Sequence, residues 1–340
     1  MILYVLVGVL AVGLSLPVDN HYENKGFLYT RQQILNRLCL VSVFLLLFLV
    51  SALRLNVGND YAKYVEFMHL IRCDAMVPTE FGFNWVVKIL YGISGFENYL
   101  LVFAVFAFAT IYLFLKAIYQ QADSFPFSFF LFMALGYYFQ TFNTVRYYLA
   151  LAIALFAIPY VLRKEWGKFI LLILLGATMH KSLLVVIPLY FLASRCWKKW
   201  QLVLAALFCS TFFFLQDFYL KLVVFLYPTY EDTEYLEGGT SMINILRCAA
   251  VLVLALLCYK KCVKENIRNR FYFYCNLGAL VMYVCCSFLP IISRIGYYLT
   301  ITHIFFLPAL VNGIENEKLR KLCRAGVILA GIVYFAVFIL

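Results

Sequence analysis

The chain has 340 residues, of which 65% are hydrophobic and only 13% are charged. Soluble domains are about half apolar and about a quarter charged, so this composition excludes an ordinary soluble fold. The 28 Lys and Arg residues outnumber the 17 Asp and Glu residues, but most of them flank apolar segments, which is a topology signal of membrane proteins. We therefore predict an all-α, polytopic integral membrane protein that forms one transmembrane domain over residues 1–340 and does not bind nucleic acid.

The sequence gives little reason to expect a metal or a cofactor. The 11 Cys residues are scattered through apolar segments, and no CxxC pair, HExxH motif or glycine-rich nucleotide loop occurs. We expect the cysteines to pack as small apolar residues. Because no glycine-rich nucleotide loop occurs, an enzyme that uses a cytoplasmic nucleotide-sugar is also disfavoured.

The apolar segments predict membrane-spanning helices. A helix needs about 20 apolar residues to cross about 30 Å of hydrocarbon, and shorter helices occur where neighbours assist. In chain order, the clear candidates are residues 2–16, 35–53, 100–115, 125–139, 147–162, 202–215, 243–258, 271–289, 295–311 and 325–340.

The segment 169–193 decides the topology. It is long enough for one span, but His180, Lys181 and Ser182 interrupt it, and basic residues flank both of its ends. Because basic flanks stay cytoplasmic, the segment should enter and return as a short broken hairpin, either spanning fully or re-entrant. This arrangement gives about 12 transmembrane segments, with both termini outside and most basic residues inside.

Two long connectors then lie outside, at residues 54–98 and 216–242. The first contains amphipathic stretches at 61–71 and 85–93, which we expect to be interfacial helices. The second holds an acidic run at 231–237, which we interpret as a solvated loop. Loops of this length usually carry function or cover a site.

Two arginines are candidates for binding a pyrophosphate at the outer face. Arg146 and Asn143 are three residues apart, so they share one helical face. Arg294 begins a predicted span and is followed by Tyr297 and Tyr298. A guanidinium binds phosphate oxygens bidentately and keeps its charge at any working pH. The alternative is an interfacial anchor or a cation-π contact with a nearby tyrosine.

Three further residues are candidates for a general base. His180 lies at the predicted hairpin tip, where an imidazole could accept a hydroxyl proton, although a lone histidine is often structural. Asp60 precedes a predicted helix, and capping that helix would also explain it. Glu80 follows a Pro-Thr pair and could serve as a base or bind sugar hydroxyls. Ser182 is a candidate supporting residue or a helix cap.

These motifs, in this order, resemble those of the EpsG family of Wzy-like bacterial exopolysaccharide and O-antigen polymerases. The resemblance covers about residues 50–310. The residues that carry it are Asn59-Asp60-Tyr61 with Tyr64, Glu80-Phe81-Gly82-Phe83-Asn84, Asn143 with Arg146, Met179-His180 with Ser182 and Pro188, and Ser293-Arg294 with Tyr297 and Tyr298. The chain departs from the family pattern at Tyr147, where Gln is common, and at Lys181, where an uncharged residue is common.

The resemblance implies a plan like that of class C glycosyltransferases, in the bacterial cytoplasmic (inner) membrane. It also implies the reaction, in which a glycan leaves undecaprenyl pyrophosphate for a terminal hydroxyl of an incoming lipid-linked repeat unit. The implied partners are undecaprenyl-pyrophosphate-linked oligosaccharide and membrane lipid, and we add a chain-length regulator and a flippase as candidate protein partners. Arg146 and Arg294 would hold the pyrophosphate, while His180, Glu80 or Asp60 would remove the acceptor proton, with Asn143, Ser182 and Tyr298 in support.

Two other functions fit parts of the same pattern. A glycan ligase would use the same donor and nearly the same residues, but transfer the finished glycan to another acceptor. A transporter or flippase for lipid-linked sugars would explain a basic cavity and a broken hairpin. The latter should show charges leading to both faces and internal repeats, and the sequence shows neither.

Overall fold

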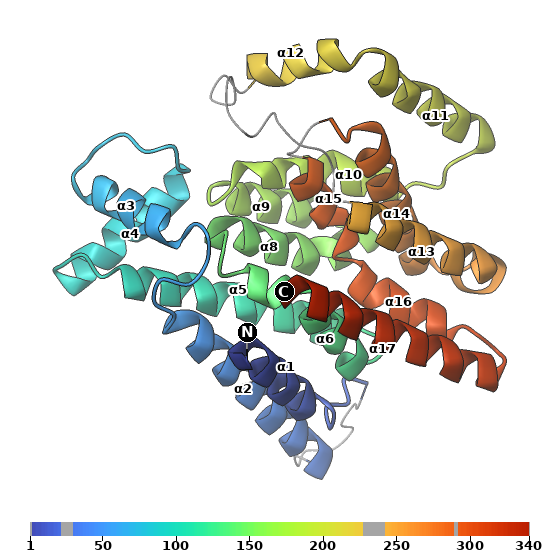
Figure 1. Cartoon of the computed structure of the whole chain (residues 1–340), viewed down its shortest axis with the longest axis horizontal. Coiled ribbons are helices and arrows are strands. Elements are labelled where there is room, and N and C mark those ends of the chain that lie inside the picture. Colours follow the sequence, from blue (N-terminus) through green and yellow to red (C-terminus); the bar gives the residue numbers. More distant parts are fainter. Residues whose placement is uncertain (1, 22–29, 227–241, 289–291, 340) are drawn as a thin grey trace. The chain divides into compact units, whose positions relative to one another are not determined.

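The computed structural model describes residues 2–21, 30–226, 242–288 and 292–339. Every regular element in these ranges is a helix (Figure 1), so the predicted all-α class is confirmed. The chain divides into two compact units, one made of Met1–Leu184 with Leu307–Leu340 and the other of Val185–Phe306. The single domain over residues 1–340 stays a prediction, and the acidic run at 231–237 lies outside the described residues.

The helices of the first unit are α1 (Ile2–Ser15), α2 (Arg31–Ala52), α3 (Tyr61–Arg72), α4 (Phe81–Ser94), α5 (Tyr99–Gln121), α6 (Phe125–Ala134), α7 (Tyr137–Gln140), α8 (Val145–Leu162), α9 (Trp166–Ala177) and α17 (Glu317–Ile339). Those of the second unit are α10 (Val186–Ala193), α11 (Lys199–Phe214), α12 (Gln216–Leu226), α13 (Met242–Leu257), the π-helical η4 (Tyr259–Val263), α14 (Ile267–Cys285) and α15 (Ile292–Thr300). The 3₁₀ helix η1 (Lys181–Val185) and α16 (His303–Asn312) cross the boundary between the units.

Five stretches of the described chain are helical, long and apolar enough to cross a membrane: Arg31–Ala52, Tyr99–Gln121, Val145–Leu162, Ile292–Asn312 and Glu317–Ile339. Shorter apolar helices accompany them, including α1, α6, α9 and α13. The chain is therefore a multi-pass membrane protein by length and composition. The count of about 12 segments and the class C plan stay predictions.

Most predicted spans correspond to observed helices, but two are interrupted. The predicted span at 295–311 falls on α15 and α16, which are separated by a turn at Ile301 and Thr302. The second interrupted span is the one predicted at 125–139. It comprises α6 and α7, because Gly136 adopts a left-handed conformation with φ of 77° and its N–H bonds the carbonyl of Met133 at 3.0 Å. A glycine in this conformation ends a helix without the cost that a Cβ would bring. The amphipathic stretches predicted at 61–71 and 85–93 are confirmed as the helices α3 and α4.

The predicted break around His180 is also confirmed. Helix α9 ends at Ala177, and the amides of Met179 and His180 both bond the carbonyl of Gly176, at 3.0 and 3.1 Å. The chain then continues as η1 into α10. A Cβ at Gly176 would collide with Leu183, so this glycine allows the close approach of the segment after the break. The return of the second arm towards its starting side stays a prediction.

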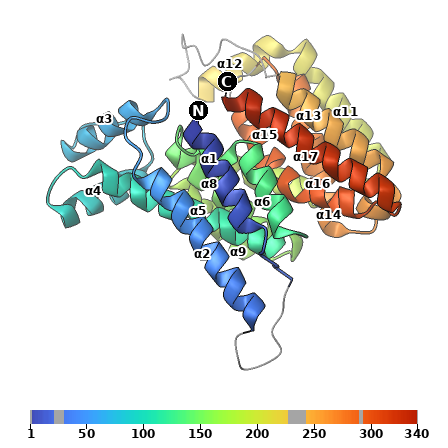
Figure 2. The ribbon, with the colours of Figure 1, turned by 60° about the horizontal axis from the view of Figure 1, so that its bottom comes forward.

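Helices α5 and α8 form the centre of the first unit. Helix α5 packs on α2 and α8, and α8 packs on α9. Figure 2 shows α1 lying along α2, in agreement with their contacts. The Tyr138 hydroxyl donates to the carbonyl of Leu47 at 2.8 Å, which ties α7 to α2. The packing of α5, α8 and α9 thus fixes the positions of the start of α8 and the end of α9.

Helix α14 is the centre of the second unit, with α10, α13 and α15 packed on it. Buried polar groups link these helices. Asn276 on α14 donates to the carbonyl of Cys248 on α13 at 3.1 Å, and its amide oxygen lies 2.8 Å from His303 Nε2. Such internal pairing is what buried polar side chains need in an apolar surrounding.

The loop before α3 lies directly against the turn before α8. Gly58 has φ of 106°, and a Cβ there would overlap the carbonyl of Phe142. The next residue, Asn59, donates its amide N–H to the Asn143 side-chain oxygen at 3.1 Å. This contact places the start of α3 beside the start of α8.

We expect Gly58→Ala to lower the melting temperature of the purified protein in detergent. An L residue in this conformation costs about 1–3 kcal/mol, and the collision with Phe142 adds to it. Gly92→Ala on α4 is the matched control, because a Cβ at that position meets nothing within 4 Å. A Gly58→Ala protein that melts at the wild-type temperature would contradict the described loop contact.

Candidate functional site

Glu80 is a buried carboxylate at the start of α4. It occupies the N-cap position of that helix, yet its side chain makes no capping hydrogen bond. The side chain is only 10% exposed. A buried carboxylate that does not cap its own helix must find its partners elsewhere.

Those partners come from two other segments of the first unit. Arg146 Nη1, at the start of α8, forms an ion pair with Glu80 Oε2. His180 Nδ1 lies 3.1 Å from Glu80 Oε1, and the backbone N–H of Lys181 donates to the same oxygen at 3.1 Å. The Arg146 and His180 side chains are 13% and 18% exposed. One carboxylate therefore joins the starts of α4 and α8 to the break after α9.

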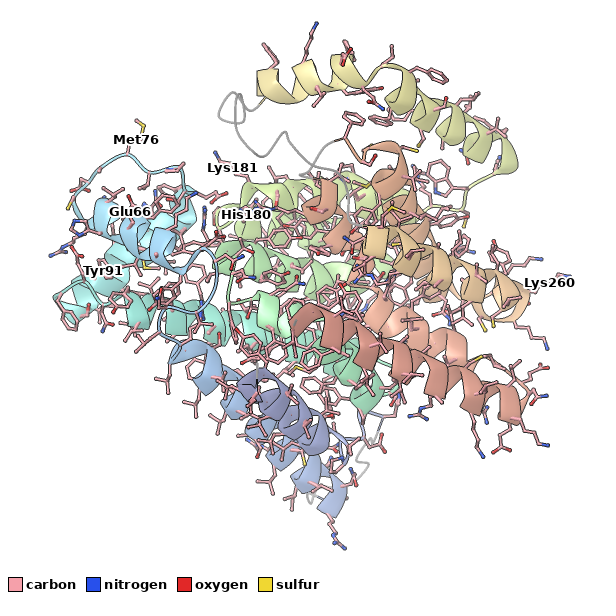
Figure 3. The ribbon with its side chains drawn as sticks, in the orientation of Figure 1. Glu66, Met76, Tyr91, His180, Lys181 and Lys260 are labelled. Carbon is pink, nitrogen blue, oxygen red and sulfur yellow. The ribbon has the colours of Figure 1, made fainter. Side chains whose placement is uncertain are left out.

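The backbone holds this junction independently of the side chains. The Gly82 N–H donates to the carbonyl of Thr178 at 2.9 Å. A Cβ on Gly82 would lie 2.5 Å from Thr178 Oγ1, so glycine is required for this approach. Figure 3 labels His180 and Lys181 at the end of α9. The Lys181 side chain is exposed, so its amide and not its ammonium group contacts Glu80.

The surroundings keep Glu80 ionised. Burial acts to raise the pKa of this carboxyl, but the hydrogen bond from His180, the charge of Arg146 and the Lys181 N–H together lower it from 4.5 to about 2. An ionised carboxylate only accepts hydrogen bonds, so the His180 Nδ1 must carry a hydrogen. In a neutral imidazole this leaves Nε2 as a proton acceptor.

Aromatic rings lie against Arg146 and His180, the two side-chain partners of Glu80. The guanidinium of Arg146 lies over the rings of Tyr64 and Phe83, with centroid distances of 5.6 and 5.3 Å. The Tyr147 ring meets the His180 ring edge-on at 5.7 Å. The predicted cation-π alternative for Arg146 is therefore present together with the ion pair. These rings limit the orientations that each side chain can adopt.

The other residues predicted in the first unit lie near its loops. The Asn143 side-chain oxygen accepts a hydrogen bond from the Asn59 N–H, as described above. Asp60 occupies the N-cap position of α3 but makes no capping hydrogen bond, so capping does not explain it. Ser182 belongs to η1, directly after the break.

Arg294 and Tyr298 belong to α15 in the second unit. Tyr298 is buried, and its carbonyl accepts the Tyr190 hydroxyl at 2.9 Å. The predicted approach of Arg294 to Arg146 and His180 stays a prediction.

Sequence reasoning missed two features of this region. The Lys181 N–H is one of the partners of Glu80, and a backbone donor carries no signal in side-chain identity. Arg54 is a buried cation directly after α2, and a charge at the end of an apolar span is the signal that could have identified it. Among the described residues, no group of three His, Cys, Asp or Glu side chains could hold a metal ion.

The depressed pKa of Glu80 predicts a specific loss of stability in acid. A carboxyl with a folded pKa of about 2 and an ordinary pKa of 4.5 stabilises the fold above pH 4.5, and this contribution disappears as the pH falls towards 2. Melting curves in detergent between pH 2 and 7 should show that Glu80→Gln loses less stability over this window than the wild type. The exposed Glu66→Gln should follow the wild type. Equal acid sensitivity of the wild type and Glu80→Gln would contradict the described ion pair.

Comparison with known proteins identifies the family of the chain. A model of the family described as the EpsG family matches residues 37–340, which include all the segments that meet at Glu80. No curated protein and no solved structure matches the chain. The family match covers most of the chain, and the protein therefore belongs to the EpsG family.

Proposed function

We propose that this protein is a polysaccharide polymerase of the bacterial cytoplasmic membrane. It transfers a glycan from undecaprenyl pyrophosphate to a terminal hydroxyl of a lipid-linked repeat unit. Membership of the EpsG family supports a polymerase-like membrane protein. The observation that carries the specific proposal is the cluster of Glu80, Arg146 and His180, which offers both a fixed cation and a proton acceptor in one buried place.

In this proposal His180 is the general base. Its Nδ1 is held by Glu80, so Nε2 is available for the acceptor hydroxyl. Glu80 itself is a weak base because its pKa is about 2, far below neutral pH. Glu80 is therefore a positioning residue, which orients the imidazole and stabilises the imidazolium that forms after proton transfer.

Arg146 stabilises the departing pyrophosphate. Its guanidinium carries five N–H donors, and one nitrogen, Nη1, is engaged by Glu80. Its Nε is buried and has no hydrogen-bond partner among the described residues. Charge builds up on the pyrophosphate as the glycosyl bond breaks, and a fixed cation lowers the energy of that state. Arg294 is the second pyrophosphate ligand in this proposal.

The decisive experiment incubates the purified protein in detergent with lipid-linked repeat units and separates the products by length. A polymerase should yield a ladder of longer glycans on the carrier lipid. A transporter would yield no longer product. A ligase would yield none either without its separate acceptor. Absence of elongation with an active substrate preparation would overturn the proposed function.

We expect His180→Gln to reduce the elongation rate by about 10²–10⁴-fold, the usual contribution of a general base. His69→Gln is the matched control, since His69 is an exposed histidine on α3 that pairs with Glu97. The rates are measured at saturating substrate. A His180→Gln enzyme with the wild-type rate would leave Asp60 as the remaining candidate base.

We expect Arg146→Lys to lose long polymer even though the positive charge is kept. A lysine ammonium cannot bind two phosphate oxygens in the planar, bidentate manner of a guanidinium. Polymer length is measured both in cells and with purified protein. Arg163→Lys, a conservative change at an exposed arginine, should retain the wild-type length distribution. Full-length polymer from Arg146→Lys would make the bidentate role untenable.

A further inference from the structure

Arg54 is a buried cation outside the cluster around Glu80. It follows α2, and only 7% of the residue is exposed. Its Nη1 donates to the Ser51 carbonyl at 2.6 Å and to Ser51 Oγ at 3.1 Å. Its guanidinium lies over the rings of Phe103 and Phe142, at 4.8 and 5.4 Å from their centroids. These contacts fix its position.

The charge of Arg54 has no anionic partner among the described residues. The ion pairs in this part of the chain do not include it, and the groups that act on its charge are the tyrosines 4, 61, 64 and 138. Burial lowers its pKa and the surrounding tyrosines partly offset this effect, which leaves a pKa of about 10. The guanidinium therefore stays charged at neutral pH, and a buried charge without a counter-charge is costly.

Two of its nitrogens also lack hydrogen bonds. Nε and Nη2 are both buried and have no partner within the described ranges. The rings compensate part of the charge through cation-π attraction, and the carbonyl end of α2 compensates part through the helix dipole. Neither supplies an acceptor for these two donors. Buried donors of this kind usually bond a protein group, a water molecule or an ion.

Arg54 is one of the residues that line a small cavity. Its polar lining comes from Ser51, Arg54, Thr110 and Thr141, and the remaining lining is apolar. The space is about 10 Å³, which is close to what one water-sized particle requires. No carboxylate lines it. The space suits a single-atom ion only slightly larger than a water molecule better than a phosphate group with its four oxygens.

We propose that this cavity is a binding site for one small inorganic anion of the size of chloride. The guanidinium supplies the positive charge and unpaired donors, and the Thr110 hydroxyl adds a polar group to the wall, whereas the Thr141 hydroxyl donates its hydrogen to the Tyr138 carbonyl. A water molecule could accept the same hydrogen bonds, but it would leave the buried charge unbalanced. An anion does both. The site is independent of the proposed transferase activity, because it follows from charge and space alone.

The anion would stabilise the segment that carries Arg146. Val145 lines the cavity and directly precedes Arg146, while the Phe142 ring beneath Arg54 directly precedes Asn143. The turn between α7 and α8 is therefore in direct contact with the anion site. Without the anion, the buried positive charge of Arg54 opposes the fold at this turn.

The test compares the melting temperature of the purified protein in chloride and in gluconate, an anion too large for the cavity, at equal ionic strength. The melting temperature should rise with the logarithm of chloride concentration, as expected for a ligand that binds only the folded state. Arg54→Met should abolish this dependence, and Arg72→Gln, a change at an exposed arginine on α3, should retain it. Equal melting temperatures in both salts, or a chloride response that persists in Arg54→Met, would overturn the proposal.

A second measurement avoids reliance on a variant that fails to fold. Crystals of the wild type grown in bromide should show an anomalous scattering peak in the cavity next to Arg54. Thr110→Val keeps the charge but removes a hydroxyl from the wall, so it should shift half-maximal stabilisation to a higher halide concentration. Absence of bromide from the cavity at a halide concentration that saturates the melting response would also overturn the proposal.

Discussion

The candidate site depends on one carboxylate. Glu80 accepts hydrogen bonds from Arg146, His180 and the Lys181 amide through its two oxygens. The charge and hydrogen position of each group depend on the others. The hydrogen bond from His180, the charge of Arg146 and the Lys181 amide keep the carboxylate ionised, and the ionised carboxylate in turn fixes the hydrogen on His180 Nδ1. Removing Glu80 would therefore leave a buried arginine without its counter-charge and an imidazole without a fixed orientation.

In this fold, the apolar lengths of the helices form the packing contacts, and the ends of the helices carry the polar groups of the site. Helices α5, α8 and α9 pack through their apolar lengths, and the polar groups lie at helix ends and in the break after α9. Two glycines make the close approaches possible, Gly82 against Thr178 and Gly176 against Leu183. A site placed at helix ends gains exposed backbone donors, such as the Lys181 N–H, without breaking hydrogen bonds inside an apolar helix. The packed lengths then hold those ends in place.

The sequence predicted the helices and named the residues, but not how they meet. Apolar length and flanking charge identified most of the helices and the break at His180, because those signals are local. The partners of Glu80 lie 66 and 100 positions away, so their convergence depends on tertiary packing. For the same reason, sequence left His180, Glu80 and Asp60 equal as bases. The break at Gly136 was missed because its surroundings are uniformly apolar, and a lone glycine there is compatible with a continuous helix.

Under the proposed function, the ion pair between Glu80 and Arg146 describes the site before substrate binds. A pyrophosphate carries more negative charge than one carboxylate, so it would compete with Glu80 for the Arg146 guanidinium. As this pair weakens, the Glu80 carboxylate becomes more available to His180. The timing suits the reaction, because His180 becomes positively charged when Nε2 takes the acceptor proton, and a neighbouring carboxylate stabilises that charge. Donor binding would therefore free the shared carboxylate to stabilise the imidazolium that forms on proton transfer, with the two substrates coupled by electrostatics alone.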